Sequence, residues 1–422
     1  MIKMKDSGTG WIGEIPDYWD IGRIDSFYTL RNTKVSDKDY PPLSVTMKGI
    51  LPQLETAAKT NAHDDRKLVK KGDFAINSRS DRRGSCGISE YDGSVSLINT
   101  ILAPKGEMHP KYYDWLFHTV QFADEFYRWG HGIVDDLWTT NYQDMKKINI
   151  PVPPMKEQIM IADFLNVCCA DIDRLDADIQ SEIAALETYK NSVITEVVTK
   201  GLDKAAPMKE SGVEWLGLVP ETWEVKRGKY VFEQKSDRGN NISLVLLSPT
   251  QNYGVIPQEM YEELSGFSAV KLNEKTDFNS LKTVHKGAFV ISLRSFQGGF
   301  EYSEYEGVVS PAYQVFYPII PVCDTYYKYL FKTQVFIDKM NSYTMSLRDG
   351  KTIAFADFGR TYIPIPPLNE QITISKWLDQ KCAELNAVID EKKEQLEILV
   401  QYKKSIIFEY VTGKKEVPNG EF

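Results

Sequence analysis

The sequence of 422 residues contains few of the side chains that build metal and redox sites. It has only five cysteines and five histidines. No two cysteines form a Cys-x-x-Cys pair, and no histidine stands near a cysteine at ligand spacing. This scarcity argues against a structural zinc site and against a disulfide framework. We therefore expect reduced cysteines, a cytoplasmic protein and no bound metal.

Long apolar runs and nucleotide-binding motifs are also missing. No segment approaches the ~18 consecutive apolar residues of a membrane span, and the first ten residues lack the apolar core of a signal peptide. The phosphate-binding motif G-x-x-x-x-G-K-[ST] does not occur. The segment YPPL at 40–43 lacks the leading Asn or Asp and the aromatic residue of the N/D-P-P-Y/F motif of adenine methyltransferases. We expect no membrane partner and no ATP site of that type.

Proline and glycine are absent from the whole stretch between Pro154 and Gly201. Apolar residues there recur at alternating steps of four and three, which predicts a long helix with a coiled-coil seam. One extra step of four between Ile179 and Ile183 predicts a local stutter. The predicted seam is Ile161, Leu165, Cys168, Ile172, Leu175, Ile179, Ile183, Leu186, Val193 and Val197.

The same stretch occurs a second time at a constant offset of 213 residues, from Pro151 to Pro364. Both copies open with I-P-x-P-P-x-x-E-Q, in which the prolines fix a sharp turn into the helix and the glutamate suits the helix N-terminus. The second predicted seam is Ile374, Leu378, Leu385, Val388, Leu396, Leu399, Ile406 and Tyr410. This internal duplication determines the predicted fold.

The segments between the helices are duplicated as well. KKGDFAINSRS at Lys70 corresponds to HKGAFVISLRS at His285, and YYDWLFHTVQF at Tyr112 corresponds to YYKYLFKTQVF at Tyr326. The patterns predict strands and helices in equivalent places of the two copies. The predicted strands are 74–76, 95–103, 289–291 and 308–317, and the predicted helices are 111–129 and 325–343.

We therefore predict an α+β protein with an internal pseudo-two-fold repeat. The predicted segments are a first domain at 1–150, helix one at 151–202, a second domain at 203–364, helix two at 365–413 and a tail at 414–422. If the seams pair within the chain, the second helix must run antiparallel to the first, with one domain at either end of the coil. Such a molecule suits a ligand with its own two-fold symmetry, and duplex DNA is the obvious candidate.

The net charge of −9 is unfavourable for a DNA-binding protein. The acids are concentrated on helix one, however, whereas the segment 66–83 carries seven Lys or Arg residues and only two acids, Asp73 and Asp81. Binding depends on the local potential more than on the total charge. A basic patch is therefore predicted in the first domain.

Sequence-reading side chains are predicted in the loop after the first matched strand and in its counterpart, because Arg, Lys, Asn, Gln and Ser suit base edges and phosphates. Arg79 and Arg294 could instead pair with a carboxylate inside each domain, and the turn lysines could simply be solvated. The tryptophans Trp11, Trp19, Trp215 and Trp223 are assigned to the core or to packing on the coil ends rather than to base stacking. The candidate DNA-binding residues are Lys70, Lys71, Asn77, Arg79, Arg82, Arg83, Lys286, Arg294, Ser295, Gln297, Arg348 and Lys351.

Three repeated motifs resemble a known family. These are the W-x-G-x-x-P-x-x-W segments ending at Trp19 and Trp223, the I-P-x-P-P-x-x-E-Q helix starts, and the Y-K-x-S-x-I-x-E-x-V-T segments starting at Tyr189 and Tyr402. Together they resemble the DNA-specificity subunit of type I restriction–modification systems. The resemblance implies two target recognition domains, each reading half of a split DNA sequence, with the helices setting the spacer.

The resemblance also implies partners. Two methyltransferase subunits would dock on the helices, and restriction (translocase) subunits would join them. S-adenosylmethionine, Mg²⁺ and ATP would bind those partners, so no cofactor is expected in this chain. The helix residues assigned to coil and partner contacts are Leu165, Ile172, Leu175, Ile179, Leu186, Leu378, Leu385, Leu396 and Leu399.

Two other functions remain open at this level. A DNA-modifying enzyme acting alone would need a catalytic cluster, and neither the scattered histidines nor the repeated motifs supply one. A coiled-coil scaffold would leave two large aromatic-rich domains without a role. A non-catalytic specificity subunit accounts for the helices and the domains together.

Overall fold

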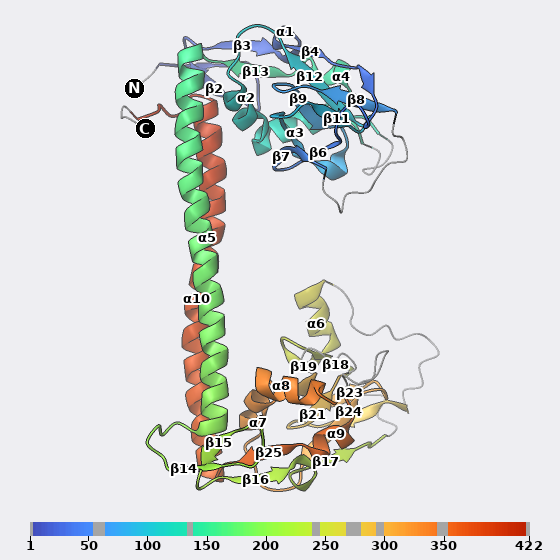
Figure 1. Ribbon diagram of the computed structural model, residues 1–422, viewed down its shortest axis with the longest axis vertical. Coiled ribbons are helices and arrows are strands. Elements are labelled where there is room, and N and C mark those ends of the chain that lie inside the picture. The colour runs from blue at the N-terminus through green and yellow to red at the C-terminus, as the bar shows by residue number, and fades with distance from the viewer. Residues whose placement is uncertain are drawn as a thin grey trace. The chain divides into compact units, whose positions relative to one another are not determined.

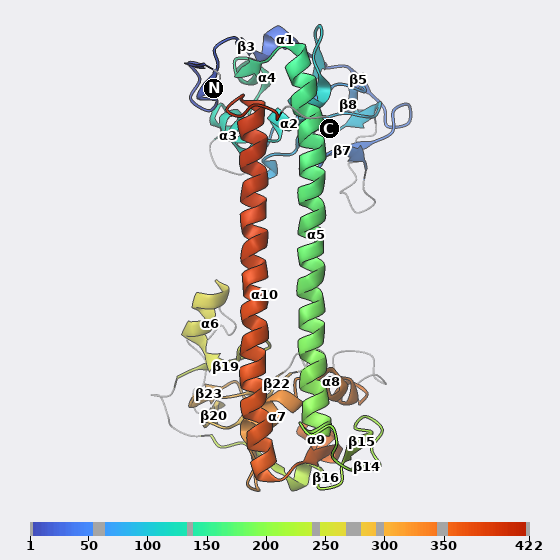
Figure 2. The ribbon, with the colours of Figure 1, turned by 90° about the vertical axis from the view of Figure 1, so that its left-hand side faces the viewer.

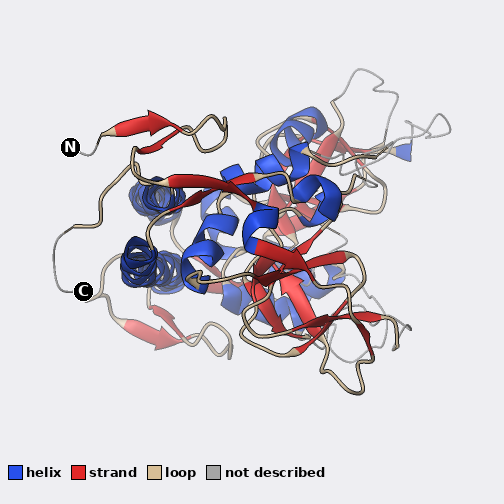
Figure 3. Cartoon of the chain, turned by 90° about the horizontal axis from the view of Figure 1, so that it is seen from above, coloured by secondary structure: helices blue, strands red, loops and turns tan. Residues whose placement is uncertain are grey.

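The computed structural model describes residues 3–53, 64–132, 138–238, 245–266, 280–292, 299–343 and 353–418 (Figure 1). The chain forms two compact units. The first unit comprises Met1–Gln180 with Lys393–Phe422, and the second comprises Ser181–Lys392. Each unit therefore holds one α/β-mixed domain together with parts of both long helices, α5 (Met155–Lys200) and α10 (Leu368–Val411). Figure 3 shows strands and short helices intermixed in these domains.

The domain of the first unit is built around an antiparallel sheet of order β10-β9-β12-β4. A smaller sheet has the order β11-β8-β5, and three strand pairs, β1–β2, β3–β13 and β6–β7, complete it. The strands are β1 (Met4–Asp6), β2 (Glu14–Pro16), β3 (Asp20–Arg23), β4 (Tyr28–Leu30), β5 (Lys34–Val35), β6 (Leu43–Thr46), β7 (Gly49–Pro52), β8 (Arg66–Val69), β9 (Phe74–Asn77), β10 (Cys86–Ile88), β11 (Gly93–Val95), β12 (Asn99–Pro104) and β13 (Asn149–Val152). The helices are α1 (Ile24–Phe27), η1 (Ser80–Arg82), α2 (Pro110–Phe117), α3 (Val120–Arg128) and α4 (Tyr142–Met145).

The domain of the second unit repeats this plan, because its main sheet has the equivalent order β22-β21-β24-β17. Its strands are β14 (Met208–Glu210), β15 (Leu218–Pro220), β16 (Glu224–Arg227), β17 (Phe232–Lys235), β18 (Leu247–Thr250), β19 (Gly254–Pro257), β20 (Lys282–Val284), β21 (Phe289–Ile291), β22 (Phe300–Tyr302), β23 (Gly307–Val309), β24 (Gln314–Pro318) and β25 (Tyr362–Ile365). Its helices are η3 (Gly228–Tyr230), α6 (Gln258–Ser265), α7 (Asp324–Leu330), α8 (Gln334–Asn341) and α9 (Phe355–Arg360). The predicted duplication is confirmed at the level of strand order.

Aromatic side chains fill both cores. The Phe74 and Phe117 rings lie 4.2 Å apart in the first unit, and the Phe289 and Phe316 rings lie 5.5 Å apart in the second. Trp19 and Trp223 are buried in these cores, as the sequence predicted, so neither is available for base stacking. Aromatic pairs of this kind add to the burial of their own large apolar area.

Four predicted elements are each divided in two. The predicted strand 95–103 is β11 followed by β12, because the backbone turns where Asn99 N donates to Ser96 O (3.1 Å). The predicted helix 111–129 is α2 followed by α3, because the Thr119 hydroxyl caps α3 by accepting from Phe122 N. Equivalent breaks divide 308–317 into β23 and β24 and 325–343 into α7 and α8. Such polar turn residues compete locally with continued regular structure.

The two long helices pair antiparallel within each unit (Figure 2). In the first unit the Phe164 and Tyr410 rings lie 4.5 Å apart, and Asp173 further along α5 bonds to Lys403, which precedes Tyr410. In the second unit Lys190 Nζ donates to Asn386 Oδ1 at 2.9 Å. The predicted antiparallel coil is therefore confirmed.

The seam of α5 differs from the predicted one at two positions. Leu175 is 49% exposed, whereas Cys169 is buried and Asp176 is half-buried. From Leu165 the covered positions are spaced regularly by four and three residues, so the predicted stutter at Ile179 is wrong. The prediction failed because Asp176, a polar residue, occupies a seam position, so the apolar pattern skips it. Its carboxylate accepts a hydrogen bond from Gln180 at 2.6 Å.

The equivalent correction applies to α10, where Ile389 is buried and the predicted Val388 is 42% exposed. The other predicted coil residues are covered as expected. Leu165, Ile172, Ile179, Leu378 and Leu385 are buried, and Leu186, Leu396 and Leu399 are half-buried.

A glutamine clamps each domain to the start of its helix. The Gln158 amide donates to Pro153 O (2.8 Å) and accepts from His109 N (2.9 Å). Gln371 makes the same two bonds, to Pro366 O and from Cys323 N, each at 2.8 Å. These bonds satisfy a buried amide and backbone groups at the turn, which explains why the motif ends in glutamine. The sequence pattern had indicated only the prolines as the cause of the turn.

The second domain contains an ion pair that has no equivalent at the same position of the first domain. Glu301 on β22 is buried, and its Oε1 lies 2.6 Å from Lys332 Nζ, which also donates to Gln251 O at 3.2 Å. The second oxygen of Glu301 has no hydrogen-bond partner among the described residues. Burial raises the pKa of the Glu301 carboxyl to about 7, although Lys332 opposes the shift. The first domain has Gly87 at the equivalent position.

We predict that Glu301 makes the stability of the second unit depend on pH. Its folded-state pKa lies above the usual value of 4.5, so its contribution is fully present below that pH and is lost as the pH rises to about 7. Relative to Glu301→Gln, the wild-type free energy of unfolding should fall by up to about 3 kcal/mol over that range. Urea denaturation at a series of pH values measures it. A difference that does not change with pH would contradict the assignment.

Candidate nucleic-acid interface

The loop after β9 is held in shape by its own polar side chains. Asn77 Oδ1 accepts from Arg79 N at 3.1 Å, and the buried Ser78 hydroxyl bonds to the Thr100 hydroxyl at 3.1 Å. Asn77 N donates to Ser85 O at 2.9 Å and closes the loop. Asn77 is half-buried and engaged in this way, so its amide shapes the loop rather than pointing freely to solvent.

Three arginine side chains of this loop lie at the surface. The exposed fractions are 42% for Arg79, 68% for Arg82 and 54% for Arg83. The nearest carboxylate to Arg79 is that of Asp81, 3.7 Å away and itself 43% exposed. Among the described residues, no core carboxylate pairs with Arg79, although the sequence left that possibility open.

Arg83 is positioned by two neighbours from α3. Its guanidinium forms an ion pair with Asp124, and its central carbon lies 5.7 Å from the centre of the Tyr127 ring. Desolvation by burial raises the pKa of the Tyr127 phenol. Exposed ion pairs contribute only about 0–1 kcal/mol, so DNA could displace Asp124 at small cost. Arg79, Arg82 and Arg83 carry three positive charges, and Asp81 and Asp124 carry two negative ones. The loop together with its α3 neighbour therefore has a net charge of +1.

A second loop lies against this one. Residues 129–132 follow α3, and the backbone of Thr139 bridges to both His131 and Arg79. Thr140 N donates to Ser78 O and Ser80 N donates to Trp138 O, each at 3.0 Å. These contacts place Arg79 beside the segment that follows α3. Residues 133–137 lie outside the described part of the chain.

The predicted turn lysines are separated from the arginine loop. Lys70 and Lys71 are exposed and precede β9, whereas the arginines follow it. A four-residue strand separates them by ~13 Å at ~3.3 Å per residue. Their backbone N–H groups donate to Asp73 and Asp92, which shapes the turn. Lys286 is also exposed, in the equivalent turn before β21.

Two residues of the predicted basic patch are structural. Arg66 is buried and bonds to the Ser94 hydroxyl (2.9 Å) and carbonyl (3.0 Å). Lys67 Nζ donates to Asn99 O at 2.7 Å, and burial lowers the pKa of its ammonium. Lys282, which matches Lys67 in the repeat, donates to Tyr313 O at 2.6 Å. Arg66 and Lys67 therefore point inward, as does Lys282 in the second domain. The basic patch on the surface of the first domain is smaller than its sequence suggests.

Part of the predicted interface of the second domain falls outside the described residues. Arg294, Ser295 and Gln297 lie within 293–298, and Arg348 and Lys351 lie within 344–352. The described flanks of the first segment are joined by Ser292 N donating to Gly299 O at 2.7 Å. This bond corresponds to the closure between Asn77 and Ser85 in the first domain. These candidates remain predictions.

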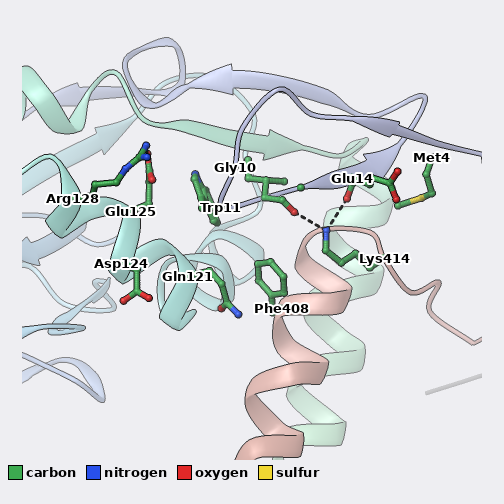
Figure 4. Close-up of a pocket in the computed structure, with 12 residues that line it drawn as sticks. Met4, Gly10, Trp11, Glu14, Gln121, Asp124, Glu125, Arg128, Phe408 and Lys414 are labelled. Carbon is green, nitrogen blue, oxygen red and sulfur yellow. Dashed lines mark hydrogen bonds and ion pairs between the residues drawn. The ribbon is translucent and has the colours of Figure 1, made fainter.

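A pocket of about 960 Å³ lies between the β1–β2 hairpin, α3 and the last turns of α10 in the first unit (Figure 4). Lys414 Nζ donates there to Ile12 O (2.6 Å) and Glu14 O (2.8 Å). Glu125 accepts from Trp129 Nε1 (2.9 Å) and from Arg128 (2.8 Å). The residues lining this pocket include no serine, cysteine or histidine. Its polar groups join the hairpin to the helix.

Searches for metal clusters and membrane spans gave no candidate among the described residues. No group of three or more His, Cys, Asp and Glu residues there could hold a metal ion. In the same part of the chain, no helix combines the length and the apolar character needed to cross a bilayer.

The chain is similar to one group of known proteins. Residues 220–398 match the model of the type I restriction modification DNA specificity domain. The chain is 23% identical to a protein named putative type I restriction enzyme MjaX specificity subunit of Methanocaldococcus jannaschii, over 96% of each chain. It is also 23% identical to the type I restriction enzyme MjaVIII specificity subunit of that organism, over 97% of this chain and 95% of the relative.

The fold has a solved counterpart. A chain from a structure described as "Structural basis underlying complex assembly and conformational transition of the type I R-M system" superposes with a TM-score of 0.70 at 13% identity. The superposition covers 95% of this chain and 99% of the other. The family model and both near full-length relatives agree, and the chain is similar to type I restriction–modification DNA specificity subunits.

Proposed function

We propose that this chain is the non-catalytic specificity subunit of a type I restriction–modification complex, and that each domain reads one half of a bipartite DNA target. The observation that carries the proposal is the duplication of a domain and its helix, with unlike residues in matched loops. The segment NSRSDRRG at 77–84 stands where the second copy has SLRSFQGG at 292–299, after a matched strand. A shared fold with different loop side chains suits two readers of different base sequences.

The helices would set the distance between the two half-targets. Helix α5 has 46 residues, which gives a length of roughly 70 Å at 1.5 Å per residue. Its seam continues without a stutter from Leu165 to Val197, so the coil has no built-in break in that stretch. A continuous coil is a suitable spacer because its length depends directly on the residue count.

Exposed apolar residues on the helices support docking of partner subunits. Tyr189 and Tyr402 occupy the same position of the two repeats and are 52% and 53% exposed. Leu175 and Ile398 add exposed apolar surface in the first unit, at 49% and 61%. A repeated exposed tyrosine fits two copies of one partner, here the methyltransferase subunit. Restriction (translocase) subunits would complete the complex, and S-adenosylmethionine, Mg²⁺ and ATP would bind these partners.

We predict that exchanging residues 1–150 for the equivalent domain of a relative with another target changes one half of the recognised sequence. The other half and the spacer should stay the same, because α5, α10 and the second domain are retained. Methylome sequencing of a host expressing the hybrid with its modification subunit measures the result. A change in both halves, or methyl transfer by the purified chain alone, would contradict the proposed function.

We predict that Arg83→Ala weakens binding of the target duplex. The loss should be ~1–3 kcal/mol if Arg83 contacts a base edge, and it should be small for a non-target duplex. Titration of labelled duplexes with the assembled modification complex measures both. Arg174→Ala is the matched control, because Arg174 is an exposed arginine (73%) paired with Asp171 on α5. Equal affinities for Arg83→Ala and the control would remove Arg83 from the interface.

A further inference from the structure

Cations stacked on tyrosines gather on one surface of the second domain. The guanidinium carbon of Arg227, at the end of β16, lies 5.3 Å from the centre of the Tyr362 ring on β25. Lys229 Nζ lies 5.1 Å from the centre of the neighbouring Tyr230 ring in η3. Tyr230 is 57% exposed and Tyr362 is 40% exposed. Large aromatic rings exposed to this extent are not core residues.

A third tyrosine is covered by two cations. The Tyr343 ring, just after α8, has Lys339 Nζ 4.6 Å and the Arg360 guanidinium carbon 5.4 Å from its centre. The Tyr343 hydroxyl accepts from the Thr361 hydroxyl at 3.2 Å, which orients the ring. The side chain of Arg360 is 65% exposed and is also bonded to Asp357. Both cations are thus ordered by the ring; Arg360 remains open to solvent, and Lys339 is half-buried.

These contacts belong to one continuous surface. Arg227 and Tyr362 are direct partners in the β16–β25 pair, and Gly228 N donates to Thr361 O at 2.8 Å. Helix α9 packs on η3, where the Gly359 backbone approaches Lys229. We call this region the basic–aromatic surface, and define it by Arg227, Lys229, Lys339 and Arg360 with the tyrosines that they cover.

The charge of this surface is opposite to that of the chain. Its four cations against Asp357 give a local charge of +3, whereas the whole chain carries −9. Among the described residues, Arg227, Lys229 and Lys339 form no ion pair with a carboxylate. An isolated positive surface on an acidic protein attracts an anionic ligand through its local potential.

The first domain contains a smaller version of the same arrangement. Lys147 Nζ lies 5.7 Å from the centre of the Trp129 ring and 3.0 Å from Asp144 Oδ1. In the repeat these residues match Arg360, Tyr343 and Asp357, at offsets of 213 or 214 residues. The ring changes from indole to phenol and the cation from ammonium to guanidinium, but the stack and its carboxylate are retained in both domains.

A feature shared by two domains that read different bases does not itself read bases. Its ligand must be common to both half-targets, and the DNA backbone has that property, since phosphate contacts position a protein without sequence information. Stacking on a ring limits the freedom of a long cationic side chain before binding, which lowers the entropy cost of each phosphate contact.

We propose that the basic–aromatic surface binds the phosphate backbone of the DNA duplex and anchors the second domain independently of sequence. The Lys147–Trp129 stack does the same for the first domain. This inference rests on the proposed function, because it assigns a backbone anchor to a chain whose loops read the bases. An acidic surface of a partner subunit is the competing ligand, and the experiment separates the two.

The test compares two double variants in the assembled modification complex. Lys229→Gln with Arg360→Gln removes two cations of the basic–aromatic surface. Lys209→Gln with Lys328→Gln removes two from elsewhere in the same domain, where Lys328 also stacks on a tyrosine, 5.6 Å from the Tyr302 ring centre. Binding of target and non-target duplexes is measured by fluorescence anisotropy over a series of salt concentrations.

The first variant should weaken both duplexes by the same factor and reduce the slope of log K against log salt by about 2, since each lost phosphate contact removes ~0.9. The control should leave affinity and slope unchanged, and Lys229→Arg with Arg360→Lys should restore wild-type binding. An unchanged slope for the first variant, or an equal loss in the control, would overturn the proposal.

Two other results would also overturn it. A loss confined to the target duplex would mean that the surface reads bases. A loss of co-purification with the methyltransferase subunit, with an unchanged salt slope in the complex that still assembles, would mean that the surface binds a protein. Failure of the proposed function is distinguishable from these outcomes, because the wild-type complex would then show no preference between the two duplexes.

Discussion

The pairing of α5 with α10 is the constraint on which the rest of the structure depends. The apolar seam provides the stabilisation, and half-buried lysines within it fix the register. Lys190 bonds to Asn386 in the second unit, and Lys403 bonds to Asp173 in the first. The two pairs are equivalent in the repeat. A polar group at a coiled-coil seam lowers stability but selects one register, because a shifted helix would leave the lysine without its partner.

Each domain is attached to both helices, and this follows from the antiparallel pairing. Besides the glutamine clamp on its own helix, the first domain donates from the Tyr112 hydroxyl to Val411 O at the end of α10 (2.7 Å). The second domain donates from Tyr326 to Val198 O at the end of α5, also at 2.7 Å. A buried phenol and a helix-terminal carbonyl satisfy each other in both places. A change in helix register would therefore disturb the domain attachments as well.

The sequence predicted those features that depend on periodicity and repetition. The duplicated motifs and the heptad spacing were sufficient for the two long helices, their antiparallel pairing and the buried tryptophans. Leu175 was misassigned because the pattern scores only apolar residues, whereas Asp176 occupies the seam position and makes a local hydrogen bond. Val388 was misassigned because it is adjacent to the apolar Ile389, and the buried residue of the two is Ile389. A polar side chain at such a position can be recognised only when its partner is known.

The candidate interface was harder to predict because it depends on tertiary contacts. The comparison of the two repeats correctly predicted that the arginine loop follows a strand. It did not predict that Arg66 and Lys67 point inward, because their partners Ser94 and Asn99 are distant in the sequence. The bridge through Thr139 and the stacks of Lys147 and Arg360 likewise join separate segments. Charge alone could not distinguish a surface cation from a structural one.

The most direct test of the helical spacer is a matched insertion of seven residues into α5 after Gln180 and into α10 after Lys392. One heptad on each helix preserves the seam and both domain attachments, and adds ~10 Å at ~1.5 Å per residue. Methylome sequencing should then show the same two half-targets separated by a spacer longer by roughly three base pairs, at ~3.4 Å each. Methylation of the original target with its original spacer would contradict the account.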